Sequence, residues 1–192
     1  MPRMAKGNSL WDRPVLVVVG GLPATGKTTI SRAVAGKVGA AHLRVDVIEQ
    51  AVVRFGRWQK SSEALDHAVE WGLGYQVMYA VAGELSAQGS HVFAECVNPL
   101  AITRDAWRDL AEELGVRLVE VELVCSDPAE HERRATTRVV DIPDHVPPTW
   151  AQIVARDYEP WDRSHIVLDT AGRSVEDAVT ELCEALGITS DV

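Results

Sequence analysis

The chain has 192 residues, of which 46% are hydrophobic and 24% are charged, the balance expected of one globular domain. Its 28 acidic residues outnumber the 19 basic ones, and the formal net charge of -9 argues against a surface that coats the phosphate backbone of nucleic acid. The three cysteines, Cys96, Cys125 and Cys183, form no CxxC pair, so neither a disulfide framework nor a zinc site is indicated.

The N-terminal segment carries positive charge but leads to no apolar stretch with a small-residue cleavage site. We therefore expect a flexible tail at residues 1–13 and a single domain at residues 14–192. The longest apolar stretch, Val15 to Ala24, is interrupted by glycine and proline and is shorter than the roughly 20 residues of a membrane-spanning helix. We expect no membrane partner and a cytoplasmic location.

Strands and helices are predicted to alternate along the chain. Short apolar segments indicate strands at residues 15–19, 41–45, 91–95, 117–125 and 165–169. Helical patterns cover residues 27–38, 46–55, 63–87, 100–114, 127–138, 149–158 and 174–186. Because this alternation requires crossover connections, we expect an α/β fold of three layers, in which helices flank a five-stranded parallel sheet.

The ends of the predicted strands are where function is expected, because ligands of such sheets bind beyond the carboxyl ends of the strands. The first strand, VLVVV, is apolar without alternation, which is typical of a central strand buried on both faces. The residues at the strand ends are Gly20 onward, Asp46, Glu95 to Asn98, Ser126 and Thr170.

A phosphate-binding pattern, GxxxxGK[ST], follows the first predicted strand and opens the first predicted helix, the context that its mechanism requires. The pattern predicts a loop whose backbone N–H groups converge on the phosphates of a nucleoside triphosphate. The predicted cofactor-binding residues are Gly21, Leu22, Pro23, Ala24, Thr25, Gly26, Lys27, Thr28 and Thr29.

Individual residues of this loop have separate expected tasks. Gly21 and Gly26 allow a close backbone approach that a Cβ would obstruct. Lys27 should place its ammonium against the β- and γ-phosphates, and the Thr28 hydroxyl should ligate Mg²⁺. The sequence therefore predicts ATP and Mg²⁺ as cofactors.

Two large classes of P-loop protein are disfavoured because their signature motifs are missing from the sequence. A GTPase needs an [NT]KxD segment after a later strand, and none occurs. The LSGGQ signature of transporter ATPases has only a poor match, at residues 85–89. A short chain with one P-loop, an acid after the second strand and arginines near the end has the layout of a small kinase.

The chain resembles the small P-loop kinases, AAA-type ATPase-like enzymes that include chloramphenicol phosphotransferase and, more distantly, zeta toxins and gluconate and shikimate kinases. The nearest match is to the chloramphenicol phosphotransferase pattern, in which a strand ending in Val-Asp precedes a helix with an Ile-Glu pair. Here these pairs are Val45-Asp46 and Ile48-Glu49. The likeness covers about residues 15–187. It implies the P-loop kinase fold and assigns Asp46 as the base that accepts the proton of the substrate hydroxyl.

Two acidic residues at strand ends have alternative interpretations. Asp46 could act as the catalytic base, hold Mg²⁺ through a water molecule, or cap the helix that follows it. Glu95, with Asn98 shortly beyond, could orient the substrate or Mg²⁺, or could face solvent at the end of its strand.

An arginine-bearing helix is predicted to begin at Asp127, with proline at its first position. In the small kinases that the chain resembles, a helix here leads into a lid whose arginines neutralise the charge on the transferred phosphoryl group. This resemblance implies a lid at about residues 133–148, with Arg133 and Arg138 as the preferred catalytic arginines. The alternative for each arginine is surface pairing, such as Glu130 with Arg134.

The sequence therefore predicts an ATP-dependent phosphotransferase that acts on a hydroxyl of a small molecule, an antibiotic or another secondary metabolite. A helical region at about residues 47–88 is expected to cover this acceptor. Two alternatives are a kinase of nucleotides or nucleic-acid ends, including toxin-like kinases, and a non-catalytic ATP-binding regulator. The acidic net charge disfavours extended nucleic acid as a partner.

Overall fold

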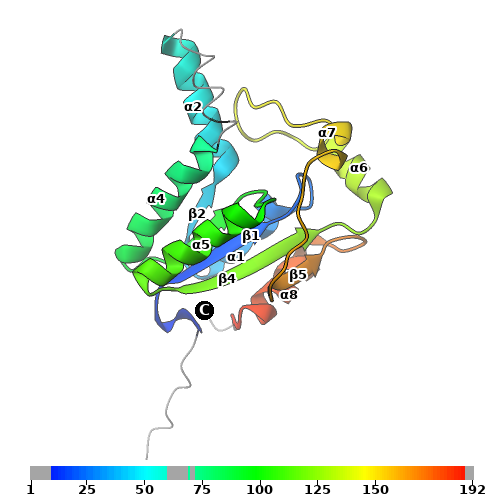
Figure 1. Ribbon diagram of the computed structural model, residues 1–192. Coiled ribbons are helices and arrows are strands. Elements are labelled where there is room, and N and C mark those ends of the chain that lie inside the picture. The colour runs from blue at the N-terminus through cyan, green and yellow to red at the C-terminus, as the bar shows by residue number, and fades with distance from the viewer. Residues whose placement is uncertain (1–9, 60–68, 70–71, 189–192) are drawn as a thin grey trace, which may run out of the picture.

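The computed structural model describes residues 10–59, 69 and 72–188. It contains a five-stranded sheet with the strand order β2-β3-β1-β4-β5, and every pair of neighbouring strands is parallel (Figure 1). The strands are β1 (Val15–Gly20), β2 (Ala41–Arg44), β3 (Val92–Glu95), β4 (Arg117–Val124) and β5 (Ile166–Asp169). The expected three-layer α/β fold with helices flanking a five-stranded parallel sheet is confirmed, and β1 is its central strand.

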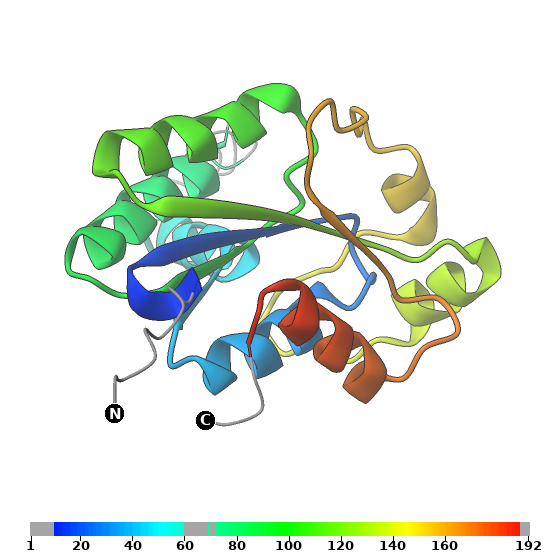
Figure 2. The ribbon, with the colours of Figure 1, turned by 90° about the horizontal axis from the view of Figure 1, so that it is seen from below.

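Helices cover both faces of the sheet (Figure 2). The α-helices are α1 (Lys27–Lys37), α2 (Val45–Gln59), α4 (Leu73–Ala87), α5 (Ala101–Leu114), α6 (Pro128–Thr137), α7 (Trp150–Val154) and α8 (Val175–Ala185). Helices α1 and α8 lie against one face, and α4 and α5 lie against the other. No helix in the described part of the chain combines the length and the apolar character needed to cross a membrane.

The core has two halves because alternate residues of β1 point to opposite faces of the sheet. Val15, Val17 and Val19 pack in the half that holds α1 and α8. Leu16 and Val18 pack in the half that holds α4 and α5. All five side chains are fully buried. Because β1 is anchored on both faces, the loop that follows it starts from a fixed position.

Several helices begin where their capping residues predict. Asp127 accepts hydrogen bonds from the backbone N–H groups of Ala129 and Glu130, with proline at the start of α6. Thr149 forms a capping box with Gln152 at the start of α7. The expected start of α6 is therefore confirmed, and α7, which ends at Val154, is shorter than expected.

The region expected to cover the acceptor is only partly described. Helix α2 continues to Gln59, four residues beyond the expected end, and α4 begins at Leu73. Residues 60–68, 70 and 71 of the expected 47–88 region lie outside the described residues. Helices α2 and α4 pack against each other and together form one side of the molecule (Figure 1).

The expectation of a flexible tail over residues 1–13 is wrong for its last part. Residues Leu10–Asp12 form a 3-10 helix, and the Trp11 indole N–H donates a hydrogen bond to the Leu186 carbonyl at 3.0 Å. The Trp11 ring also stacks on Phe93, with 6.3 Å between ring centroids. This packing places the start of the folded region before residue 14, because a large aromatic side chain there covers the edge of the core. Residues 1–9 lie outside the described residues.

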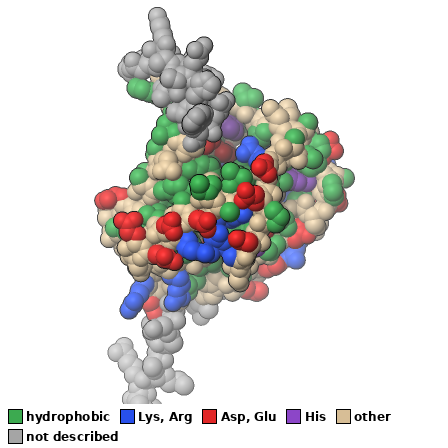
Figure 3. Space-filling model, viewed as in Figure 1, with side chains coloured by type: hydrophobic (Ala, Val, Ile, Leu, Met, Phe, Trp, Pro, Cys, Tyr) green, Lys and Arg blue, Asp and Glu red, His purple; other side chains and the backbone are tan. Residues whose placement is uncertain are grey.

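Basic and acidic side chains are mixed on the molecular face displayed in Figure 3. Arg163 is an example of a basic side chain surrounded by acidic ones. It contacts Asp105 at 2.5 Å and Asp162 at 3.1 Å. Its guanidinium also lies 3.9 Å from Glu120. Mixed charge of this kind does not form the uniform basic surface that binds a nucleic-acid backbone.

Candidate active site

A cavity of about 750 Å³ lies at the carboxyl ends of β1, β2 and β3. Its walls come from the loop after β1, the first turns of α1 and α2, the end of α6 and the segment 139–148 that follows α6. The size is within the usual range for a small-molecule site. Residues of the segment 139–148 line the cavity, so part of the predicted lid region belongs to the site.

The loop after β1 is shaped by two glycines with positive φ. Gly21 has φ 131°, and a Cβ there would collide with the Leu123 carbonyl oxygen of β4. Gly26 has φ 96° and precedes α1 with no side-chain cap on the helix. The first backbone N–H groups of α1 are therefore available to an anion, which the helix dipole also favours.

Lys27, the first residue of α1, is buried and lines the cavity. Its Nζ donates a hydrogen bond to the Leu22 carbonyl at 2.8 Å. Burial lowers the pKa of Lys27, and the charges of Glu95 and Asp46 oppose that shift. The ammonium therefore lies between the phosphate-binding loop and two carboxylates of the same cavity.

Thr28 and Glu95 contact each other directly. The Thr28 hydroxyl donates a hydrogen bond to Glu95 Oε1 at 2.5 Å, and Glu95 Oε2 lies 3.0 Å from His42 Nε2. Burial alone would raise the pKa of Glu95, but the hydrogen bonds from His42 and Thr28 and the charge of Lys27 hold it below its ordinary value. Glu95 is therefore an ionised carboxylate beside the hydroxyl expected to ligate Mg²⁺. The interpretation of Glu95 as a solvent-facing acid is wrong, because its residue is only 5% exposed.

The donor set fits Mg²⁺. This ion prefers oxygen ligands, and it is commonly held by one or two carboxylates together with phosphate oxygens and waters. The Thr28 hydroxyl and the Glu95 carboxylate are adjacent, and Asp46 lines the same cavity. Residues from β3, α1 and α2 could therefore hold the ion beside a bound triphosphate.

Asp46 lies in the first turn of α2, which begins at Val45. The alternative that Asp46 is the capping residue in front of this helix is wrong, because Asp46 is already the second residue of the helix. Its carboxylate lines the cavity and acts electrostatically on Lys27 and Arg138. No hydrogen bond or ion pair reaches this carboxylate from any residue that the structure describes.

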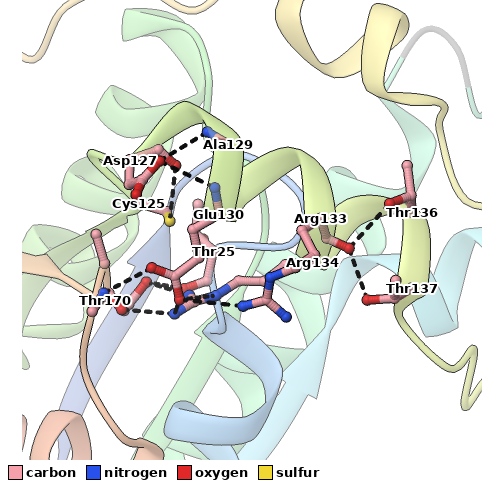
Figure 4. Close-up of polar contacts among 12 residues, drawn as sticks. Thr25, Cys125, Asp127, Ala129, Glu130, Arg133, Arg134, Thr136, Thr137 and Thr170 are labelled. Carbon is pink, nitrogen blue, oxygen red and sulfur yellow. Dashed lines mark hydrogen bonds and ion pairs between the residues drawn. The ribbon is translucent and has the colours of Figure 1, made fainter.

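Helix α6 is tied to the phosphate-binding loop through Thr170, at the end of β5 (Figure 4). Arg134 donates to the Thr170 hydroxyl at 2.8 Å and to its carbonyl at 2.7 Å, and the Thr170 hydroxyl donates to the Thr25 carbonyl at 3.0 Å. Arg134 also pairs with Glu130 at 2.6 Å. The alternative of pairing with Glu130 is therefore confirmed for Arg134, which in addition holds α6 against the loop.

Two arginines of α6 and its C-cap residue, Arg138, have different positions. Arg138 and Arg134 line the cavity. Burial lowers the pKa of the Arg138 guanidinium, and the charge of Asp46 opposes that shift. Arg133 does not line the cavity; its side chain is 66% exposed and lies 3.8 Å from Glu130. The structure therefore brings Arg138 to the site but not Arg133, which is turned toward solvent by the rotation of one helical position relative to Arg134.

Sequence reasoning missed a second contact between α6 and the loop. The Nε2 of His131 in α6 lies 2.8 Å from the Pro23 carbonyl, and its ring packs edge-on against Trp150. His131 is buried. His131 lies four residues before Ala135, which is also buried in α6, and this helical spacing could have indicated that both face inward.

The lid segment is held by an ion pair that sequence reasoning also missed. Arg44, at the end of β2, makes two hydrogen bonds to the Asp141 carboxylate at 2.8 and 3.0 Å. Arg32 of α1 reaches the same carboxylate at 3.0 Å. The hydrogen bond from Arg44 chiefly lowers the pKa of Asp141 to about 2. Asp141 is therefore ionised near neutral pH and fastens the lid across the cavity.

Comparison with known proteins agrees with this geometry. The model of the family described as AAA domain matches residues 16–155. The chain is 25% identical over 181 residues to a probable adenylyl-sulfate kinase of Aeropyrum pernix, which covers 89% of this chain and 91% of the relative.

Two solved structures show the same fold. The Mycobacterium tuberculosis APS kinase CysC, in complex with AMPPNP and APS, is 20% identical with a TM-score of 0.61, and the match covers 91% of this chain and 98% of that one. A gluconokinase from Sinorhizobium meliloti is 19% identical with a TM-score of 0.55, and the match covers 92% and 98% of the two chains. The fold of this chain is therefore that of the P-loop kinases.

Proposed function

The chain belongs to the AAA domain family, and from this membership and the site geometry we propose that it is an ATP-dependent phosphotransferase that moves the γ-phosphate of ATP to a hydroxyl of a small molecule. The observation that carries the proposal is the meeting of Lys27, Thr28, Glu95 and Asp46 in one cavity of about 750 Å³. These residues come from α1, β3 and α2, and residues of the lid segment 139–148 line the same cavity.

The nucleotide would bind at the P-loop end of the cavity. The backbone N–H groups at the end of the loop and the start of α1, residues 24–28, would receive the phosphates, and Lys27 would place its charge on the β- and γ-phosphates. Thr28 and Glu95 would hold Mg²⁺, which when bound neutralises charge on the phosphate oxygens. Thr29, beside them in the cavity wall, remains a candidate contact to the nucleotide.

The acceptor would be activated by Asp46. Its carboxylate has no hydrogen-bond partner among the described residues, so its oxygens are available to accept a proton from a hydroxyl. Arg138 lies in the same cavity and can neutralise charge on the phosphoryl group as it moves. Phosphoryl transfer depends mainly on positioning and electrostatics, which are the contributions that these groups would make.

A transfer screen with γ-labelled ATP and Mg²⁺ tests the proposal. The purified chain is incubated with a library of metabolites and antibiotics, and the products are separated from ATP. We expect the label to appear on at least one hydroxyl compound and to be absent with the Lys27→Ala variant. ATP hydrolysis that no library member changes, together with a stable protein complex in cells, would instead favour the non-catalytic regulator.

A nucleotide acceptor is the second candidate, favoured by the similarity to a probable adenylyl-sulfate kinase over 89% of this chain. The library should therefore include adenylyl sulfate, nucleosides and a 5′-hydroxyl oligonucleotide. Binding of the oligonucleotide that weakens steeply with salt would support a nucleic-acid-end kinase. Label only on small molecules without a base would exclude this second candidate.

A further inference from the structure

Glu49 is a carboxylate of the cavity that the proposed reaction does not use. It lies three residues beyond Asp46 on α2, so both side chains are on the same side of that helix, and both line the cavity. No hydrogen bond or ion pair to Glu49 is present among the residues that the structure describes. A partly buried carboxylate with no protein partner is costly unless a ligand completes its contacts.

The neighbouring helix is shaped around this side chain. Gly74, in the first turn of α4, faces Glu49, and a Cβ at Gly74 would collide with Glu49 Cγ and lie 2.7 Å from Oε1. The next residue, Tyr75, also lines the cavity, and its hydroxyl accepts a hydrogen bond from the Asn98 backbone N–H at 2.9 Å. The glycine therefore makes room for Glu49 to lie between the two helices at the edge of the cavity.

The two carboxylates differ in the charges that surround them. Asp46 acts on Lys27 and on Arg138, which both line the cavity. Within the described part of the chain, the cation that acts on Glu49 is Arg156, and the Arg156 residue is exposed to solvent. Burial, with a further contribution from Asp46, raises the pKa of Glu49 to about 7. Its negative charge is therefore the less compensated of the two.

We propose that Glu49 binds a protonated amine of the acceptor, so that the substrate class is an alcohol with an amino group within a few bonds of the hydroxyl that is phosphorylated. This inference rests on the proposed function, because it places the reacting hydroxyl at Asp46. The spacing fits, since side chains three residues apart on a helix have Cβ atoms about 5–6 Å apart. The Val146 and Pro147 side of the lid, which also lines the cavity, offers an apolar surface to the carbon skeleton.

The test uses matched pairs of acceptors. Amino sugars and aminoglycosides are each compared with their N-acetylated forms, and D-glucose and D-gluconate serve as neutral and anionic probes. Phosphate transfer is measured, and binding to the protein loaded with Mg²⁺ and AMPPNP is measured by calorimetry. We expect transfer to at least one free amine, with kcat/KM about 10- to 100-fold higher than for its N-acetylated form.

Three variants test whether the preference for a free amine depends on Glu49. Glu49→Gln should lower kcat/KM for the amine about 10- to 100-fold while the affinity for Mg·ATP stays unchanged. Gly74→Ala leaves the charge of Glu49 intact but displaces its side chain, so it should lower kcat/KM in the same direction. Glu113→Gln, on the exposed side of α5, removes the same charge far from the cavity and should have no effect.

The outcomes separate this inference from the proposed function. Transfer to neutral or anionic acceptors that Glu49→Gln and Gly74→Ala leave unchanged overturns the amine inference and leaves the kinase proposal standing. Failure of every free amine both to bind and to be phosphorylated also overturns it. Loss of Mg·ATP binding by the unmodified chain, or hydrolysis without transfer to any compound, would count against the proposed function itself.

Discussion

The two ends of the cavity are built in different ways. At the P-loop end, the polar groups are already paired: Thr28 with Glu95, Glu95 with His42, and the Thr25 carbonyl with Thr170. At the α2 end, Asp46 and Glu49 have no hydrogen-bond partner among the described residues. The first end is therefore rigidly organised, as the proposed phosphate site requires, whereas the second presents free groups that the proposed acceptor can complete.

Replacing Lys27 should have the largest effect on phosphate transfer, and it changes only the P-loop end of the cavity. Lys27→Ala removes the buried charge beside the β- and γ-phosphates, so we expect phosphate transfer to fall below detection. The fold should persist, because the buried apolar residues Ile30, Val34 and Ala35 anchor α1 in the core. Transfer and circular dichroism are measured together, and Lys37→Ala at the far end of α1 is the matched control. Retained kinase activity in Lys27→Ala would refute the assignment of the phosphate-binding loop.

Replacing Asp46 should impair catalysis at the α2 end of the cavity and leave nucleotide binding at the P-loop end intact. Asp46→Asn keeps the size of the side chain but removes its ability to accept a proton, so we expect kcat to fall about 10²- to 10⁴-fold. The affinity for ATP should stay nearly unchanged, because the phosphates bind at the opposite end. Steady-state kinetics and nucleotide titration give the two values. A normal kcat would leave Asp46 without a role as base.

Glu49, at the α2 end, should make the free energy of unfolding depend on pH. Its pKa is raised from 4.5 to about 7, so the folded state binds a proton more tightly than the unfolded state and loses stability as the pH rises from about 5 to 8. Glu49→Gln lacks this loss. The free energy of unfolding of the unmodified chain should therefore fall by about 1–3 kcal/mol relative to Glu49→Gln across that range. Parallel curves in urea titrations at several pH values would contradict this prediction.

The lid contact should give the smallest effect. Asp141 is ionised and paired with Arg44, but it is 46% exposed, so Asp141→Asn should cost no more than about 1 kcal/mol and raise KM a few-fold. Added salt should weaken the contact and reduce the difference between the variant and the unmodified chain. Asp109→Asn, on the exposed side of α5, controls for the change in charge. A difference that salt leaves unchanged would argue that Asp141 acts otherwise than through this ion pair.

The same division explains what the sequence could predict. The loop motif, the apolar β1 and the alternation of elements follow from local patterns, so the fold and the position of Lys27 and Thr28 were accessible. The partners of Glu95 and Asp141 were not, because His42 lies 53 residues from Glu95 in the sequence and Arg44 lies 97 residues from Asp141. Choosing between Arg133 and Arg134 required the rotation of α6, since adjacent residues on a helix point about 100° apart.

Calorimetric titration with ATP, in the presence and absence of Mg²⁺, tests most directly whether the P-loop end holds a metal–nucleotide complex. We predict binding that Mg²⁺ strengthens in the unmodified chain and a loss of that strengthening, about 10- to 100-fold, in Glu95→Gln, where the charged oxygens beside Thr28 are gone. No heat with Mg·ATP, or an equal effect of Mg²⁺ in both proteins, would contradict the placement of nucleotide and metal at this end of the cavity.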